Sequence, residues 1–290
     1  MNNILKVVEV HNFDDFGRKK YMRTLPIWRV DKDGGILSDD NLAAEEPLEI
    51  LIGYGSANKR QRQTIAVTMR TPEQDVELAL GFLFTEGVIS HQKEVVNVQF
   101  ISENKLLINL SESVTFDLER LNRHFYTTSS CGVCGKSSLE AVSTTSCFIL
   151  NPHIPVVPKE IFFELVQKLR LQQSVFDSTG GIHASGLFDM EGNLLKVCED
   201  VGRHNALDKL IGWAFQKGLL PLKNHILLVS GRVSFELVQK AIMAGIPIVA
   251  AVGAPSSLAV ELADDNNMTL IGFLRDGRFN VYAGAKRIIF

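Results

Sequence analysis

Two closely spaced cysteines are the residues of this sequence best suited to do chemistry. Cys131 and Cys134 are separated by two residues in the stretch TSSCGVCGK, residues 128–136, of a chain with four cysteines in 290 residues. Such a pair can supply half of a metal site, cycle between dithiol and disulfide, or carry sulfur as a persulfide. The function depends on which of these three chemistries the pair performs.

A zinc site needs more ligands than this pair supplies. Structural zinc takes four, commonly from a second cysteine pair or from two closely spaced histidines, and this sequence has neither. Zinc deaminases carry His-x-Glu followed downstream by Pro-Cys-x-x-Cys. Here Ser130 precedes the pair in place of proline, and Ser185 follows His183 where the catalytic glutamate would stand. These departures weaken the zinc interpretation, and we expect no metal.

The neighbouring residues favour a mobile thiol over a redox pair that caps a helix. Thioredoxin-like pairs lie at a helix N-terminus, where the dipole lowers the thiol pKa. Gly132 and Gly135 would weaken such a helix by roughly 1 kcal/mol each relative to alanine. Lys136 brings a cation near the thiols, which favours the thiolate. A sulfur-carrying loop, a redox pair and a surface loop with two incidental cysteines all fit this composition.

Glycine-rich breaks in the C-terminal half form a second group of candidates. Three of them lie between a predicted strand and a predicted helix, where α/β sheets bind ligands and helix N-termini attract phosphate. Arg203, Arg232 and Arg275 are suited to bind phosphate oxygens. We expect an anionic, nucleotide-like ligand, although each break alone fits a tight turn, and no Gly-x-Gly-x-x-Gly or Walker motif is present. The breaks are residues 178–183, 199–205, 230–234 and 252–257.

Ionisable residues in these breaks and in the helix that follows them have more than one interpretation. Asp200 and His204 could form a general-base pair, but we expect Asp200 to hold a loop and leave the role of His204 open. Glu236 and Lys240 stand four positions apart on a predicted helix, which is typical of a solvated ion pair.

Composition indicates a cytoplasmic protein. The chain is 46% hydrophobic and 22% charged with a net charge of −3, so nothing points to nucleic acid or to an anionic membrane. It shows no signal peptide and no uncharged apolar run of about 18 residues, so we expect no membrane span. Its thiols should be reduced, and Cys147 and Cys198 lie in apolar runs typical of buried small hydrophobes.

The elements that must position these residues begin with a small α+β unit. Residues 1–20 are expected to be a loosely held leader, and residues 45–116 to form two hairpins and a helix. Thr71, Pro72 and Gln74 predict the start of that helix, through a capping box and a proline at its first position. The expected hairpins pair residues 47–52 with 64–69 and residues 95–100 with 105–110.

Beyond residue 151 the pattern changes to alternating strands and helices. The wholly apolar runs 226–229 and 248–251 are typical of a sheet covered on both faces. We therefore expect an α/β architecture with a largely parallel sheet. The expected strands are 182–187, 194–197, 226–229, 248–251 and 270–273, and the expected helices are 158–173, 205–217, 235–244 and 257–263.

Six longer motifs follow one another along the chain. They are TSSCGVCGKSSLE (128–140), TGGIHASGLF (179–188), EDVGRHNALDKLIGWA (199–214), SGRVSFELVQKAIMAGIP (230–247), APSSLAVELA (254–263) and TLIGFLRDGRFNVYAG (269–284). Together they resemble the formate dehydrogenase accessory sulfurtransferases, from about residue 46 to residue 288. Several long motifs in the right order are far more specific than a single cysteine pair.

The resemblance implies a fold and a reaction. The fold would be α/β, with a smaller N-terminal α+β domain (1–126) and a cytidine-deaminase-like three-layer domain (127–290) opened by the cysteine loop. The reaction would take persulfide sulfur from a cysteine desulfurase and pass it to the molybdenum of the bis(molybdopterin guanine dinucleotide) cofactor, before that cofactor enters formate dehydrogenase. The cofactor is cargo, and its guanine nucleotide moiety is an anionic ligand of the kind expected above. The resemblance also implies a homodimer.

The resemblance assigns roles by position. Cys131 would bear the persulfide, with Cys134 as its partner or relay. Six residues would lie against the cofactor, namely Phe273, Leu274, Arg275, Asp276, Gly277 and Arg278. An alternative is a non-catalytic chaperone that binds the cofactor and docks it to an apoenzyme, for which the cysteines would be dispensable. A zinc-dependent deaminase-like enzyme is a third interpretation, and it predicts stoichiometric zinc.

Overall fold

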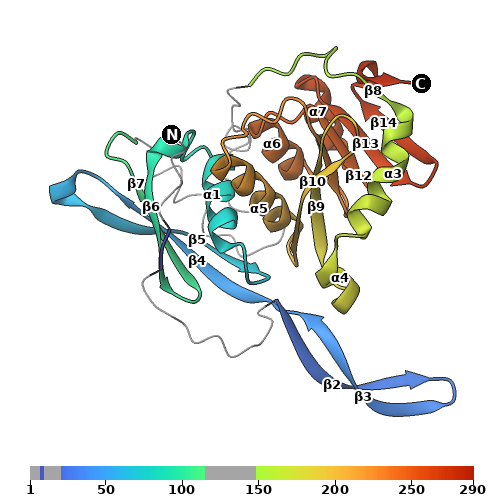
Figure 1. Ribbon diagram of the computed structural model, residues 1–290, viewed down its shortest axis with the longest axis horizontal. Helices are drawn as coiled ribbons and strands as arrows, with labels where there is room; N and C mark the ends of the chain where they lie inside the picture. Colours follow the sequence, from blue (N-terminus) through green and yellow to red (C-terminus); the bar gives the residue numbers. More distant parts are fainter. Residues whose placement is uncertain (1–6, 10–20, 115–147) are drawn as a thin grey trace.

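The computed structural model describes residues 7–9, 21–114 and 148–290 (Figure 1). Its main parts are an N-terminal sheet, a C-terminal sheet covered by helices, and a long two-stranded hairpin. The α/β class expected from the sequence is confirmed. In these described ranges, no helix is both long and apolar enough to cross a membrane.

Five strands form the N-terminal sheet: β1 (Val7–Glu9), β4 (Glu46–Tyr54), β5 (Gln61–Arg70), β6 (Val95–Ser102) and β7 (Lys105–Leu110). Their spatial order is β1-β6-β7-β4-β5. Both expected hairpins are confirmed, because β4 pairs antiparallel with β5, and β6 with β7. Ile50, Ile52 and Ile108, on the central strands β4 and β7, are fully buried in the core.

Helix α1 (Asp75–Thr85) follows β5, but the capping box expected at its start is wrong. The residue before the helix, Gln74, has a left-handed backbone with φ of 58° and no side-chain cap. The hydroxyl of Thr71 instead accepts a hydrogen bond of 3.2 Å from the backbone N–H of Val201, 130 residues away. A contact between distant parts of the chain therefore replaces the local cap.

Six strands form the C-terminal sheet: β9 (His183–Phe188), β10 (Leu194–Asp200), β11 (Ile226–Val229), β12 (Ile248–Ala251), β13 (Thr269–Arg275) and β14 (Arg278–Ala283). Their order is β10-β9-β11-β12-β13-β14. The expectation of a largely parallel sheet is wrong, since β12 pairs in parallel with β11 and β13 while the other pairs of this sheet are antiparallel. The short β9–β10 and β13–β14 connections permit antiparallel pairing only.

Helices cover both faces of this sheet (Figure 1). Successive strand residues point to opposite faces, so Leu227 and Val229 belong to one core cluster and Ile226 and Leu228 to another. The expected three layers are confirmed, while the likeness to cytidine deaminases stays a prediction. One face carries α3 (Lys159–Arg170), and the other carries α5 (Arg203–Gln216), α6 (Phe235–Met243) and α7 (Ser257–Asp265). Smaller elements are α4 (Ser174–Thr179) and the paired strands β8 (Val157–Pro158) and β15 (Ile288–Ile289).

A long hairpin projects from the body of the molecule (Figure 1). Strands β2 (Met22–Asp31) and β3 (Gly34–Ala43) pair antiparallel along their full ten-residue lengths. The sequence does not predict them, because Pro26 and Gly34-Gly35 are residues that disfavour strands. We call residues 22–43 the arm.

The two sheets are joined where α1 crosses α5. A Cβ on Gly81 would come within 1.9 Å of the Asp208 carbonyl oxygen, and one on Gly212 within 1.8 Å of the Glu77 carbonyl oxygen. Only glycine allows the two backbones to approach this closely. One hydrophobic cluster therefore runs from the N-terminal sheet through both helices to the C-terminal sheet. The predicted boundary at residues 126/127 lies outside the described residues and stays a prediction.

Candidate functional site

Loops from several strands meet at one edge of the C-terminal sheet. The carboxyl ends of β10, β11, β12 and β13 lie at this edge, and so does His183, the first residue of the oppositely directed β9. The Gly253 N–H donates to the Gly231 carbonyl at 3.0 Å, and the Phe273 N–H donates to the Gly253 carbonyl at 3.1 Å. These backbone bonds hold the loop after β11, the loop after β12 and the end of β13 side by side. We call this the loop edge.

Three helices begin at the loop edge. Gly202, Ser234 and Ser256 are the N-cap residues of α5, α6 and α7. A helix N-terminus presents free backbone N–H groups and a partial positive charge, which together attract anions. The sequence-based expectation of three strand-end loops before helix starts is thus confirmed, and the fold brings all three to one edge.

The six residues expected to contact a cofactor form the β13–β14 turn and its flanks. Phe273 has a left-handed backbone with φ of 52° and is 41% exposed. Residues 275–278 are exposed as well. Leu274 points the other way, because its side chain is fully buried in the cluster that includes α3 residues. A ligand at this turn would therefore meet the backbone of Leu274 and the side chains around it, and cofactor contact stays a prediction.

His204 belongs to a polar cluster between α5 and α6. Its Nε2 lies 3.4 Å from the Ser234 hydroxyl and 3.8 Å from Oε2 of Glu236. Burial raises the pKa of Glu236, but hydrogen bonds from His204 and Ser234 outweigh it and lower that pKa to about 2. The solvated Glu236–Lys240 pair expected from the sequence is wrong, since Lys240 is buried and its Nζ lies 2.9 Å from both carboxylate oxygens of Asp208.

His183 and Arg203 face the same region. Burial, and then the charge of Arg203, lowers the pKa of His183, so its ring is neutral at neutral pH. A Cβ on Gly231 would lie 3.2 Å from the His183 Nδ1, which places the ring against the loop after β11. Among the described residues, the buried Nε of Arg203 and the buried hydroxyl of Ser185 have no hydrogen-bond partner. The unpaired Arg203 Nε–H is a donor that an anionic ligand could satisfy.

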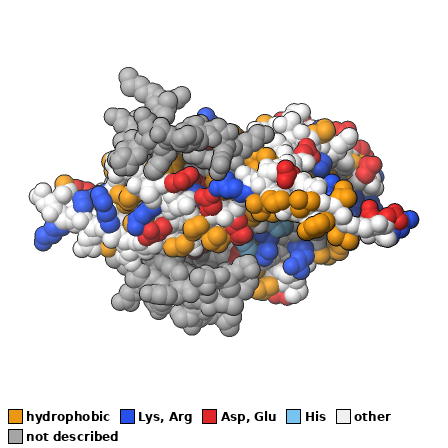
Figure 2. Space-filling view, turned by 90° about the horizontal axis from the view of Figure 1, so that it is seen from below, with side chains coloured by type: hydrophobic (Ala, Val, Ile, Leu, Met, Phe, Trp, Pro, Cys, Tyr) orange, Lys and Arg blue, Asp and Glu red, His pale blue; other side chains and the backbone are white. Residues whose placement is uncertain are grey.

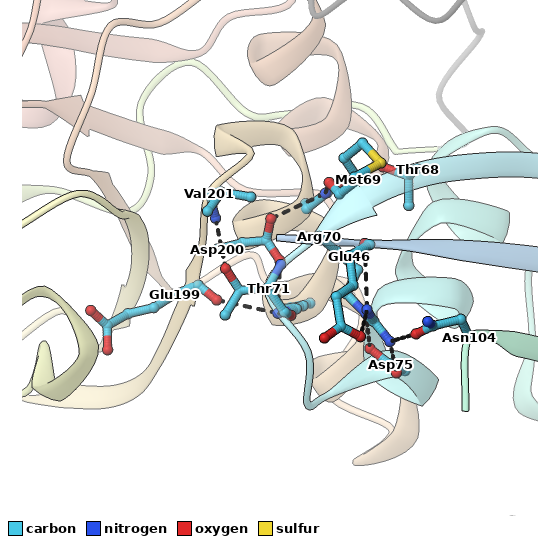
Figure 3. A network of polar contacts seen from close by, with 12 residues as sticks. Glu46, Thr68, Met69, Arg70, Thr71, Asp75, Asn104, Glu199, Asp200 and Val201 are labelled. Carbon is cyan, nitrogen blue, oxygen red and sulfur yellow. Dashed lines mark hydrogen bonds and ion pairs between the residues drawn. The ribbon is translucent and has the colours of Figure 1, made fainter. Parts of the chain in front are cut away.

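Asp200 has the structural role expected for it. Its fully buried carboxylate accepts an N–H bond from Thr71 at 3.1 Å (Figure 3). It also lies 2.8 Å from the Lys209 Nζ and accepts an N–H bond of 2.8 Å from Gly202. Asn205 donates to it as well, at 3.1 Å. In the described part of the chain, Asp200 makes no hydrogen bond or ion pair with His204, so the two do not form a general-base pair. The cluster ties the loop that leads into Arg203 and His204, the first two residues of α5, to the segment between β5 and α1.

Arg70, the residue before Thr71, anchors the other side of that segment. Its guanidinium is buried and makes two bonds of 2.9 Å to the Asp75 carboxylate, and it also donates to Asn104 at 2.9 Å (Figure 3). The bidentate geometry fixes the turn from β5 into α1. The N-terminal sheet thus helps to position one loop of the loop edge.

The described cysteine is not a reactive one. Burial raises the pKa of Cys198 to about 12, so its thiol stays protonated, and the expectation of a buried small hydrophobe is confirmed. Cys131, Cys134 and Cys147 lie outside the described residues. In residues 21–114 and 148–290, no group of His, Cys, Asp and Glu side chains is arranged to hold a metal ion.

Comparisons with known proteins give consistent matches. Residues 43–289 match the family model described as FdhD/NarQ. The chain is 48% identical over 268 residues to "Sulfur carrier protein FdhD" of Streptomyces coelicolor, covering 89% of this chain and 92% of that protein. It is 41% identical to the protein of the same name from Sulfolobus acidocaldarius, and the match covers 92% of this chain and 98% of that protein.

A solved structure shares the fold. The crystal structure of a proposed formate dehydrogenase accessory protein from Desulfotalea psychrophila superposes with a TM-score of 0.70 at 23% identity, covering 93% of this chain and all of that one. At this level of identity the match supports the fold alone.

Two groups at the site were not predicted from the sequence. Ser234 and Glu236 lie 30 or more positions from His204, so no short spacing links them to it. Thr71 and Lys209 were likewise not linked to Asp200, because their contacts depend on how the two sheets pack. The one signal that could have drawn attention to Ser234 is its position between a strand and a helix, where N-cap residues are common.

Proposed function

Because this chain belongs to the FdhD/NarQ family, we propose that it is a sulfurtransferase that carries sulfur as a persulfide for formate dehydrogenase. The similar proteins are named sulfur carriers, and the similar solved structure is of a proposed formate dehydrogenase accessory protein. Those names support sulfur carriage, and the donor, the acceptor and the residue roles below complete the proposal.

In the loading step, the Cys131 thiolate attacks the outer sulfur of a cysteine desulfurase persulfide. A new sulfur–sulfur bond forms to Cys131 while the bond in the donor breaks, and the desulfurase leaves as a thiolate. Sulfur moves without a net change of oxidation state. Lys136 is close in sequence and favours the attacking thiolate.

In the delivery step, Cys134 acts as the relay. Its thiolate attacks the Cys131 sulfur, a Cys131–Cys134 disulfide forms, and hydrosulfide leaves toward the molybdenum of the bis(molybdopterin guanine dinucleotide) cargo. The two cysteines supply the two electrons that convert the outer sulfur to sulfide. A cellular dithiol then reduces the disulfide by thiol exchange.

The cargo binds at the loop edge in this proposal. The observation that carries it is the side-by-side arrangement of the loops after β11 and β12 and the end of β13, together with the buried, unpartnered Nε of Arg203. Arg203 and the exposed Arg232 would bind phosphate oxygens, and Phe273 with residues 275–278 would flank the guanine nucleotide moiety. We also infer a cytoplasmic location and a homodimer, as the family resemblance implies.

Mass spectrometry tests the sulfur chemistry. After incubation with a cysteine desulfurase and cysteine, the peptide that holds Cys131 and Cys134 should gain the mass of one sulfur atom. Cys131→Ala should abolish both this gain and the activation of formate dehydrogenase. Cys198→Ala is the matched control and should change neither, because its thiol is buried and protonated. Full activation by Cys131→Ala would show that the protein is not a sulfurtransferase.

The alternative is a non-catalytic chaperone that shields the cofactor and hands it to the apoenzyme. The stacked loops favour it as much as they favour sulfur transfer, because both need a bound cargo. Under the chaperone hypothesis Cys131→Ala stays active while Arg275→Ala and Arg278→Ala lose activity. Under the sulfurtransferase hypothesis all three lose activity.

A further inference from the structure

The arm has little contact with the rest of the described chain. Arg23 pairs with Glu46 at 2.5 Å, the Ala44 N–H donates to the Tyr21 carbonyl at 2.9 Å, and β3 lies against α4. The first two of these contacts are at the base of the arm. Beyond it the two strands run out past the C-terminal layers (Figure 1). An isolated two-stranded hairpin is marginally stable in water, so a projecting arm of this length calls for a function.

Both faces of the arm carry exposed apolar side chains. Trp28 lies directly opposite Leu37, so the two share a face, and they are 69% and 65% exposed. The other face carries Leu25 and Ile36, which are 48% and 64% exposed. Figure 2 shows apolar side chains gathered along the arm. Exposed apolar clusters of this kind mark interaction sites.

The edges of the arm are protected against strand addition. Pro26 lacks an N–H group on β2, and β3 carries the adjacent charges of Asp39 and Asp40. Proline and charged residues are the features that keep exposed edge strands from pairing with another chain. The arm is therefore built to bury its faces against a partner, without extending a sheet.

The size of the arm fits a transient partner. A ten-residue strand is about 33 Å long, so the two strands offer roughly 300 Å² on each face and about 600 Å² on both faces together. Stable interfaces bury about 800 Å² on each partner, so the arm alone is too small to hold a permanent dimer. Interfaces at the small end of the range are typical of brief encounters.

The position of the arm indicates which partner it meets. Helix α4, against which β3 lies, leads through Gly180 to His183 at the loop edge. Viewed from below, histidine and basic side chains lie beside the apolar band of the arm (Figure 2). A protein that takes an anionic ligand from the loop edge must approach past the arm.

We propose that the arm is the docking surface for the apoenzyme that receives the cargo, through an apolar groove on that apoenzyme. This inference rests on the proposed function, in which formate dehydrogenase is the acceptor. The arm holds the acceptor against the loop edge during transfer and then releases it.

Direct binding of purified formate dehydrogenase apoenzyme to the full-length protein tests the proposal. Trp28→Ser/Leu37→Ser alters one face of the arm and Leu25→Ser/Ile36→Ser the other. Lys32→Ser, in the turn between the strands, is the matched control. At least one face variant should weaken binding tenfold or more, since well-packed aromatic and aliphatic anchors dominate interfaces. Persulfide loading and the molar mass from light scattering should match those of Lys32→Ser.

Other outcomes would overturn the proposal. If both face variants bind the apoenzyme as the Lys32→Ser control does, the arm is not the docking surface. A fall in molar mass would make it a contact between copies, and a fall in persulfide loading would assign it to the desulfurase. Failure of the proposed function is a separate result, since it appears as absent loading on wild-type Cys131 whatever the arm does.

Discussion

Asp200→Asn should destabilise the protein strongly without changing its side-chain shape. The substitution removes the counter-charge from Lys209, whose ammonium lies 2.8 Å away and is 1% exposed. It also replaces one carboxylate oxygen by an amide NH2 group, which would face either the Thr71 N–H on the Oδ2 side or the Gly202 N–H on the Oδ1 side, and both of these are donors. Breaking a buried ion pair on one side costs about 3–5 kcal/mol. We expect the free energy of unfolding to fall by that amount, out of a total on the order of 5–15 kcal/mol for a globular protein.

A double-mutant cycle measures the interaction free energy between Asp200 and Lys209 apart from the other contacts of each residue. Lys209→Met alone should cost a similar amount, because it leaves the Asp200 carboxylate buried without its cation. The double variant Asp200→Asn/Lys209→Met leaves no unpaired charge, so its cost should fall short of the sum by about 2 kcal/mol or more.

Urea unfolding followed by circular dichroism measures these changes. With a slope near 3 kcal/mol per molar urea, Asp200→Asn should lower the midpoint by roughly 1 M or more. A loss below about 1 kcal/mol, or costs that simply add in the double variant, would refute the reasoning that this pair locks the loop edge to the N-terminal sheet.

Three further predictions concern other contacts. Gly81→Ala should cost about 3 kcal/mol or more, because its Cβ would lie 1.9 Å from the Asp208 carbonyl oxygen. In the same thermal melts Gly35→Ala, whose Cβ would meet no heavy atom closer than 3.5 Å, should stay within about 0.5 kcal/mol of wild type. Glu236 has a folded-state pKa of about 2 against an ordinary value of 4.5, so its stabilisation is present above the higher value and is lost as the pH falls toward the lower one. Between those two pH values the unfolding free energy of the wild type should fall by up to about 3 kcal/mol more than that of Glu236→Gln. If the two proteins show the same dependence of unfolding free energy on pH, the His204–Glu236 contact is contradicted. Cys198, with a pKa of about 12, should resist iodoacetamide in the folded protein and react in urea; equal labelling in both states would show that it is not buried.

Local patterns predicted the elements that local forces control. The apolar runs 226–229 and 248–251 form buried strands with the expected bounds. A strand covered on both faces is marked in the sequence by an unbroken apolar run, which is a local signal. The hairpins of the N-terminal sheet followed from pairs of apolar, β-branched segments separated by short polar or glycine-rich breaks. The loop edge was predictable for the same reason, since strand ends and helix starts are visible in sequence.

Long-range packing decided the rest. Thr71 looks like a helix cap until the N–H of Val201 reaches it from another part of the fold. Lys240 looks like a surface partner of Glu236, but the packing of α1, α5 and α6 buries it against Asp208. The arm was missed because Pro26 weakens the strand signal there.

The glycine crossing of α1 and α5 also limits how the chain can change. In each clash the opposing atom is a backbone carbonyl oxygen, of Asp208 or of Glu77. No smaller side chain at a second site can make room, so a suppressor of a Gly81 substitution would have to tilt or shift a whole helix. Tilting α1 would pull on the segment that carries Thr71, and through Asp200 on the loop edge. Genetic suppression of changes at this crossing should therefore be rare, and the rare suppressors should also affect ligand binding far from it.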